Sequence, residues 1–195
     1  MRSTFFNTWF ADCEGFFEIR LFRENRPIHW EFFTSVKSLS NYDYPADCDC
    51  YFSVCPRINP KGEKRFIRQV PGLWLDIDCG ENGHKKKPRY ATIKEAAKEL
   101  LKEIPHHPDY VMSTGGGIHA YWKFREPFEI TSDADIERIE GNMKGMAIRL
   151  GADYTSDLSR ILRIPDTFNN KQKDCPRECK IIYPKEQIQS DALQS

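Results

Sequence analysis

The sequence predicts an α+β domain in which a mixed or antiparallel sheet carries helices on one side. Short segments alternate apolar and polar residues with the period of a strand, and two longer segments repeat apolar residues with the period of an amphipathic helix. A glycine turn joins two of the strand segments as a hairpin, which favours this class over a regularly alternating α/β fold. With 195 residues, of which 39% are hydrophobic and 13% aromatic, one compact domain can bury a substantial core.

Charge is balanced over the whole chain but unevenly distributed along it. The 29 basic and 29 acidic residues give a formal net charge of zero. Acidic residues gather over 43–49, whereas basic residues gather over 57–68 and 84–89. A neutral total does not exclude a nucleic-acid partner, because binding depends on the local charge.

The seven cysteines are unevenly spaced, which is not the pattern of a disulfide framework. We therefore expect reduced thiols and a cytoplasmic protein. The N-terminus has no apolar segment of a signal peptide and no stretch is long enough to span a membrane, so no membrane partner is expected. A four-thiolate zinc site from Cys48, Cys50, Cys175 and Cys179 is an open alternative, although neither pair has the usual spacing.

The first elements are predicted from aromatic spacing and turn residues. Aromatic residues at helical spacing predict a short helix over 4–13, which Gly15 ends. The segments that follow are expected to be strands over 16–21, 30–33 and 50–55, turns at 26–27 and 59–62, a helix directly after 33 and a loop over 41–49.

An acidic strand over 72–78 follows, and its residues alternate with period two. Its odd-numbered positions from 73 to 77 are apolar and point to one face, whereas Trp74, Asp76 and Asp78 point to the other. The two aspartates are roughly 7 Å apart along the strand, so their carboxylates can converge on one or two divalent cations. The alternative is a half-exposed strand with two solvated acids, but aspartate is depleted in strands, which favours a functional role.

The remaining elements are predicted from caps, periodicity and turns. A capping box begins at Thr92 and another at Ser132, each followed by an amphipathic stripe. The expected elements are helices over 93–104 and 133–150, a hairpin of strands 110–113 and 118–124, and a last strand over 180–183. The polar tail over 185–195 is expected to be frayed or to mark the cut end of a longer chain.

Two further stretches carry groups suited to phosphate. The glycine turn over 114–117 lies between Ser113 and His119, and its backbone amides can approach phosphate oxygens closely. The alternative is a tight hairpin with a satisfied histidine. The segment over 157–171 holds Asp157, Arg160, Arg163 and Lys171, which offer a third carboxylate and grips for phosphates; the alternative is a surface turn with ordinary ion pairs.

In this order the acidic strand, the glycine turn into His119 and the segment 157–171 resemble motifs of the archaeo-eukaryotic primase superfamily. The likeness is strongest to primase-polymerase domains of phage, plasmid and CRISPR-associated type, and it extends over residues 15–171, including 54–57. Two positions depart from the family pattern. Gly117 stands where many members carry serine, and Asp166 stands where related domains often have glycine after Ile-Pro.

The resemblance implies a single catalytic domain over 1–184. It would consist of an N-terminal α/β module, about 1–70, and an RRM-like palm, about 71–184. Asp76, Asp78 and Asp157 would be catalytic and would bind two Mg²⁺ or Mn²⁺ ions. Nucleotide would be bound by a larger set: Arg57, Ser113, Gly117, His119, Arg160, Arg163 and Lys171.

The resulting hypothesis is a template-directed nucleotidyltransferase, a DNA primase and polymerase. Its partners would be a single-stranded DNA template with its primer, NTP or dNTP, and further domains of a longer chain. Lys85, Lys86, Lys87 and Arg89 would contact the nucleic-acid backbone. Two alternatives stay open at this point: a non-catalytic RRM-like module that binds single strands, and a metal-dependent nuclease.

Overall fold

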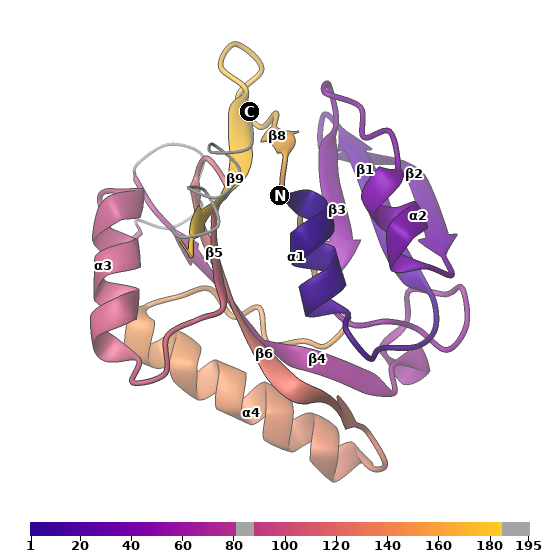
Figure 1. Ribbon diagram of the computed structural model, residues 1–195. Helices are drawn as coiled ribbons and strands as arrows, with labels where there is room; N and C mark the ends of the chain where they lie inside the picture. Colours follow the sequence, from indigo (N-terminus) through magenta and orange to yellow (C-terminus); the bar gives the residue numbers. More distant parts are fainter. Residues whose placement is uncertain (81–87, 185–195) are drawn as a thin grey trace, which may run out of the picture.

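The computed structural model describes residues 1–80 and 88–184 and has the predicted α+β architecture, a curled mixed sheet with four α-helices (Figure 1). The helices are α1 (Arg2–Trp9), α2 (Val36–Asn41), α3 (Ile93–Glu103) and α4 (Asp133–Leu150), with a 3-10 helix η1 (Lys64–Phe66). The strands are β1 (Phe17–Arg23), β2 (Arg26–Phe33), β3 (Asp49–Ser53), β4 (Gln69–Asp78), β5 (Tyr110–Ser113), β6 (Gly117–Glu129), β7 (Ile161–Arg163), β8 (Thr167–Asn169) and β9 (Arg177–Tyr183).

The strands form one sheet in the order β2-β1-β3-β8-β9-β5-β6-β4, and β7 pairs with β3 beside β8. Most neighbours are antiparallel, but β8 runs parallel to β3. The strands β8 and β9, late in the chain, therefore join the N-terminal strands β1–β3 to the C-terminal strands β4–β6. The acidic strand β4 is at the edge of the sheet and pairs with β6.

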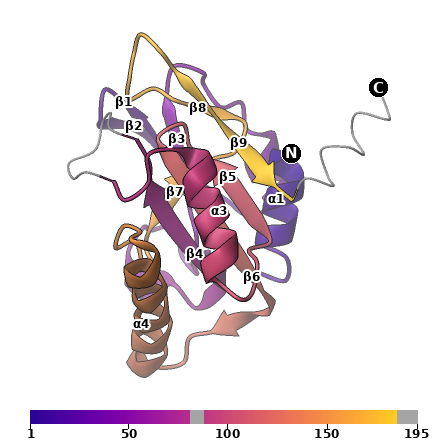
Figure 2. The ribbon, with the colours of Figure 1, turned by 90° about the vertical axis from the view of Figure 1, so that its left-hand side faces the viewer.

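Helices α3 and α4 cover one face of the β4–β6 region (Figure 2). The alternation of β4 directs Leu75 and Ile77 to this face, where they are buried against Leu100 of α3 and Leu150 of α4. Both helices begin at the predicted caps. Thr92 accepts from the backbone amide of Glu95, and Ser132 forms a capping box with Asp135.

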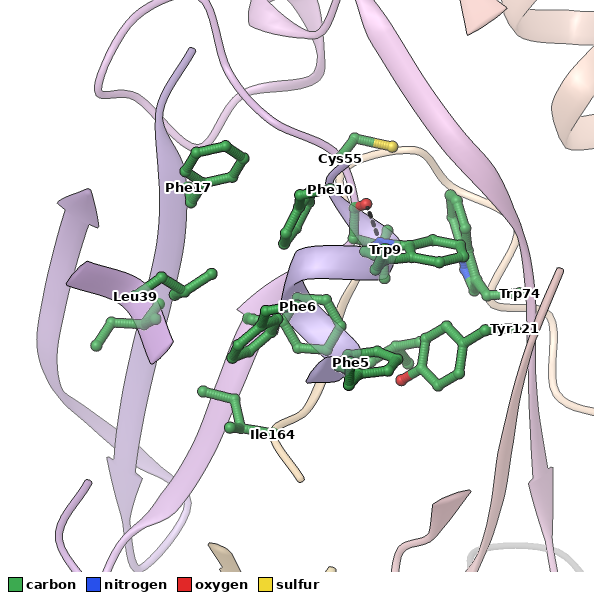
Figure 3. Packing of buried hydrophobic residues seen from close by; sticks show 14 of the residues in the cluster. Phe5, Phe6, Trp9, Phe10, Phe17, Leu39, Cys55, Trp74, Tyr121 and Ile164 are labelled. Carbon is green, nitrogen blue, oxygen red and sulfur yellow. Dashed lines mark hydrogen bonds between the residues drawn. The ribbon is translucent and has the colours of Figure 1, made fainter. Parts of the chain in front are cut away.

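The N-terminal helix α1 fills the space between the two halves of the sheet (Figures 1 and 3). Phe5 packs edge-on against Phe52 of β3 and Tyr121 of β6, with ring centroids 5.7 and 4.9 Å apart. Trp9 is fully buried, and its Nε1 donates to the backbone oxygen of Val54 at 3.0 Å. The N-terminal and C-terminal parts therefore share one hydrophobic core.

The structure corrects several predicted elements. Strands β7 and β8 occur where the sequence predicts only loop and a basic segment, and α1 ends at Trp9 rather than near residue 13. The first hairpin turns at Glu24 and Asn25, both with positive φ, rather than at 26–27. No helix of the described residues is long and apolar enough to cross a membrane.

Candidate active site

Strands β4 and β6 place the predicted acids and histidine at one end of the sheet. The register pairs Asp76 with His119 and Asp78 with Gly117. The two strands approach so closely at this end that a Cβ on Gly117 would lie 2.2 Å from the backbone oxygen of Ile77. A serine at position 117 is therefore excluded in this arrangement, which explains the departure from the family pattern.

Asp76, Asp78 and His119 line one pocket together with residues of several other strands and loops. The remaining lining residues are Tyr51, Thr114, Gly116, Arg160, Ile161, Leu162, Arg163, Asn169, Lys171, Gln172, Cys175 and Arg177. The pocket thus brings together a large part of the predicted site: Asp76, Asp78, His119, Arg160, Arg163 and Lys171.

The Asp76 carboxylate faces an imidazole and a guanidinium group at long distance. His119 Nε2 lies 3.4 Å from its Oδ1, and Arg160 Nη2 lies 3.7 Å from its Oδ2. Burial disfavours the charged form, but attraction to His119, Arg160 and Lys171 outweighs it, so the pKa of Asp76 lies below its ordinary value of 3.8. The carboxylate is therefore ionised at neutral pH.

His119 is buried, and each of its two ring nitrogens faces a different neighbour, Asp76 or Tyr121. Its Nε2 faces the Asp76 carboxylate, which can only accept, so this nitrogen donates. Tyr121 lies 3.3 Å from Nδ1, and its hydroxyl donates to that nitrogen when the imidazole is neutral. Burial raises the pKa of Tyr121 well above 10, so this hydroxyl keeps its proton. The ring is thus fixed with Nε2 toward the pocket.

Arg163 is a buried cation positioned by an acid of the N-terminal half. Its Nη1 donates to Asp49 Oδ1 at 2.6 Å, and its guanidinium lies 4.9 Å from the ring centroid of Tyr51. The buried atoms Arg163 Nη2 and Arg160 Nε have no hydrogen-bond partner within the described residues. Buried donors of this kind are costly unless an acceptor reaches them, so the pocket is suited to an anion.

The glycine turn is anchored by β8 and β9. Asn169 Nδ2 donates to the Thr114 oxygen at 2.7 Å, and Arg177 Nη1 donates to the Gly115 oxygen at 2.6 Å. Gly115 has a φ of +78°, and a Cβ there would lie 2.4 Å from Arg177 Cβ. Thr114 and Gly116 line the pocket, whereas the predicted Ser113 and Gly117 do not.

The Asp157 carboxylate is bound by residues that lie outside the pocket lining. Its carboxylate accepts from the Ser159 amide at 2.7 Å and pairs with Lys64 Nζ at 3.0 Å, and Lys64 also pairs with Glu140. Burial raises the pKa of Asp157, but the bonds from Ser159 and Lys64 outweigh it, so that pKa is lowered from 3.8. Asp157 does not line the pocket with Asp76 and Asp78.

Other predicted residues are also absent from the pocket lining. Arg57 is fully buried, its Nη1 donates to the Cys55 oxygen at 3.0 Å and its Nη2 lies 3.3 Å from Glu18. This placement differs from the predicted nucleotide contact, because the guanidinium is committed to the N-terminal half. Arg89 Nη1 donates to the Arg149 oxygen at 2.9 Å, at the end of α4. Lys85, Lys86 and Lys87 lie outside the described residues.

The cysteines of the zinc alternative do not gather as a ligand set. Cys48, Cys50 and Cys179 are buried, whereas Cys175 is exposed. Burial raises the pKa of Cys50 to about 12 and that of Cys179 to about 11, which favours the protonated thiols. Across residues 1–80 and 88–184, no three histidine, cysteine or acidic side chains are grouped so that they alone would hold a metal ion.

The two carboxylates do fit a cation that shares its ligands with a substrate. Asp76 is ionised, and Asp78 lines the same pocket together with Arg160, Arg163 and Lys171, whose charges are suited to phosphate. Mg²⁺ is typically held by one or two carboxylates together with substrate phosphates and water. Asp76 and Asp78 are the residues that would hold such an ion.

The fold is shared with solved structures of archaeo-eukaryotic primase-type domains. One solved structure with this fold is the primase-polymerase domain of cyanophage S-2L, with a TM-score of 0.62, 12% identity, and coverage of 93% of this chain and 88% of that one. Primase RepB′ superposes with a TM-score of 0.59 and 13% identity over 100% of this chain, which spans 65% of RepB′.

No protein-family model matches the chain. No curated protein matches it in sequence. At 12–13% identity the two structural neighbours establish the shared fold, and both are primases.

Proposed function

We propose that this chain is a template-directed nucleotidyltransferase that transfers nucleotides from NTP or dNTP to a 3′-hydroxyl, as a primase-polymerase. One observation carries the proposal: the ionised carboxylate of Asp76 and the cationic residues Arg160, Arg163 and Lys171 line the same pocket in a primase-type fold. A nucleoside triphosphate with its divalent cations complements both kinds of group.

Divalent cations, Mg²⁺ or Mn²⁺ held by Asp76 and Asp78, would neutralise the triphosphate and lower the pKa of the attacking hydroxyl. The chain's own residues bind and orient the substrate. Arg163, fixed by Asp49, and Lys171 grip phosphate oxygens, and once Asp76 holds a cation the Nε2 hydrogen of His119 is released from Asp76 to donate to the same anion. Phosphoryl transfer depends mostly on such positioning and electrostatic stabilisation.

The direct test is nucleotide incorporation by the purified chain. Primer extension and de novo priming are measured on single-stranded DNA with Mn²⁺ or Mg²⁺, using NTP and dNTP separately. The wild type should incorporate nucleotides, and the double variant Asp76→Asn/Asp78→Asn should lose incorporation. Asp43→Asn is the matched control, because this exposed acid does not line the pocket.

Two results would overturn the proposal. One is a folded wild type that incorporates nothing under any of these conditions, and the other is full activity of the double variant. Cation-dependent nucleotide binding, measured by calorimetry, separates the remaining classes. Single-strand binding without it indicates a binding module, and cleavage of the DNA indicates a nuclease.

A further inference from the structure

A row of aromatic and cationic side chains crosses the N-terminal strands toward the candidate active site. The register places Trp30 opposite Arg20, Arg20 opposite Tyr51, and Tyr51 opposite Arg163. Directly opposed residues of antiparallel strands point to the same face, so these four side chains form one line across β2, β1, β3 and β7. We call them the cation–aromatic track.

Contacts within the track alternate between rings and guanidinium groups. Arg20 lies 4.6 Å from the ring centroid of Trp30, and Arg163 lies 4.9 Å from that of Tyr51. Phe22, two residues after Arg20 on β1, packs edge-on against Tyr51 at 5.4 Å. These contacts fix the order in which aromatic rings and guanidinium groups follow one another across the strands.

The opposite face of the same strands is used for the core. Ile19, Leu21 and Phe52 alternate with the track residues and belong to the buried cluster around α1. The track face is more open: the Trp30 side of β2 is exposed, and Trp30 itself is 52% accessible. Arg20, Phe32 and the backbone at Gly62 contact Trp30, yet much of this tryptophan on an edge strand remains open to solvent.

The track leads into the candidate active site. Tyr51 and Arg163 line the pocket that holds Asp76, and Trp30 lies three strands from Arg163, about 14 Å by a strand spacing of ~4.8 Å. Burial raises the pKa of Tyr51 to about 12, so its hydroxyl stays neutral and does not repel an anionic polymer. The continuity gives a polymer a path from the edge of the sheet to the reacting centre.

Negative charge along the track is already neutralised. Glu18 is buried and lies between Arg20 and Arg57, and Asp49 is paired with Arg163. The backbone at Gly62 lies on the outer pair, since a Cβ there would be 2.5 Å from both Arg20 Nη2 and Trp30 Cζ2. That turn brings further cations beside the track.

The nearest of these cations is Lys61, which directly precedes Gly62, and Arg65 of η1 shares a ring contact with it. They lie 5.6 and 4.9 Å from the ring centroid of Phe66, and both are exposed. Arg65 also pairs with Glu63 at 2.9 Å. Rings beside exposed cations are the pattern that single-stranded nucleic acid requires, with bases on the rings and phosphates on the charges.

We propose that the cation–aromatic track binds single-stranded DNA and guides the template strand into the active site, with a base stacked on Trp30. The choice of DNA as occupant rests on the proposed function. The track itself predicts single-strand binding that needs neither divalent cations nor nucleotide, because its charges belong to side chains.

The test is fluorescence anisotropy with a 5′-labelled single-stranded DNA 12-mer in EDTA. Trp30→Ala should weaken binding about tenfold or more, because loss of one stacked base has an effect of this size. Trp30→Phe keeps a ring and should fall between the wild type and Trp30→Ala. His29→Ala, on the other face of the same strand, is the matched control and should bind as the wild type does.

Salt dependence gives a second readout. Replacing both Lys61 and Arg65 by Ala should reduce the slope of log affinity against log salt by about 0.7 for each phosphate that these side chains neutralise. Unchanged binding by Trp30→Ala, or tighter binding of duplex DNA or RNA than of single-stranded DNA, would overturn the track proposal.

The two proposals fail in different ways. A wild type that binds through Trp30 yet extends no primer overturns the nucleotidyltransferase and keeps the track. A wild type that extends primers no better than Trp30→Ala does at limiting template overturns the track and keeps the nucleotidyltransferase.

Discussion

Asp76 and Asp157 are both held in the charged state, but by contacts of different quality. Asp76 faces the His119 imidazole at 3.4 Å and the Arg160 guanidinium at 3.7 Å, distances too long for good hydrogen bonds. Asp157 has partners at 2.7 and 3.0 Å from Ser159 and Lys64. An acid with long contacts can exchange them for a ligand, whereas an acid with short contacts must first break them. The Asp76 carboxylate is thus available to bind a ligand, whereas the Asp157 carboxylate is held by its contacts within the protein.

The largest expected effect concerns catalysis. Asp76→Asn should lower the kcat/KM of nucleotide incorporation by about 10³-fold, because the charge that would hold a cation is lost. Asp157→Asn should lower it by less than about tenfold, since Asp157 does not line the pocket. Steady-state incorporation assays compare the two, and equal losses would mean that Asp157 shares the cations after all.

A second expected effect concerns the acid that supports Arg163. Asp49 is buried and accepts from Arg163 Nη1 at 2.6 Å and from the Asn170 amide at 2.9 Å. Asp49→Ala should cost about 3 kcal/mol of unfolding free energy, because it leaves a buried guanidinium without its partner. Urea unfolding measures this loss.

Asp47→Ala is the control for Asp49. Asp47 lies in the loop two residues before Asp49, but its ion pair with Arg23 is exposed, so its replacement should cost well under about 1 kcal/mol. Similar losses of unfolding free energy in the two variants would contradict the distinction between the buried ion pair of Asp49 and the exposed ion pair of Asp47.

The smallest expected effect is a pH dependence. Because the folded-state pKa of Asp157 lies below 3.8, its contacts stabilise the fold above that pH and are lost as the pH falls through the folded pKa. At pH 7, Asp157→Asn should cost less than about 1 kcal/mol, since the side chain is 54% exposed. The gap between the urea midpoints of wild type and variant should narrow as the pH is lowered below 3.8, and a gap that widens there would refute this assignment.

Local sequence patterns were sufficient to predict the strand that supplies Asp76 and Asp78 to the pocket and the helices that pack behind it. The alternation around Asp76 and Asp78 predicts the strand and its acidic face, and the caps at Thr92 and Ser132 predict where two helices begin. Trp74, on the acidic face, is fully buried and donates to the Thr155 oxygen at 2.8 Å, as expected for a packing residue.

Long-range contacts account for what the sequence did not reveal. Strands β7 and β8 have three residues each and owe their conformation to pairing with β3 and β9. Tyr51 and Arg177 reach the pocket from distant segments without any local motif. Asp157 and Arg160 are close in sequence, and the Arg160 amide donates to the Asp157 backbone oxygen across a turn. Even so, only Arg160 lines the pocket, and no local pattern indicates this difference.

One substitution relative to the family pattern is accommodated by backbone conformation. Asp166 has a φ of 58°, the left-handed region that glycine adopts easily. The turn after Ile164 and Pro165 is therefore kept despite the aspartate. The Asp166 carboxylate also accepts from the Arg2 amide at 2.8 Å, which ties the start of α1 to this turn.

The close approach of Gly117 to the Ile77 oxygen has a consequence for the dimensions of the site. A side chain at position 117 would force a shift, because its Cβ would meet backbone rather than the end of a flexible side chain. Position 117 is opposite Asp78 and two residues before His119, so such a shift would move the strand pair that carries both groups.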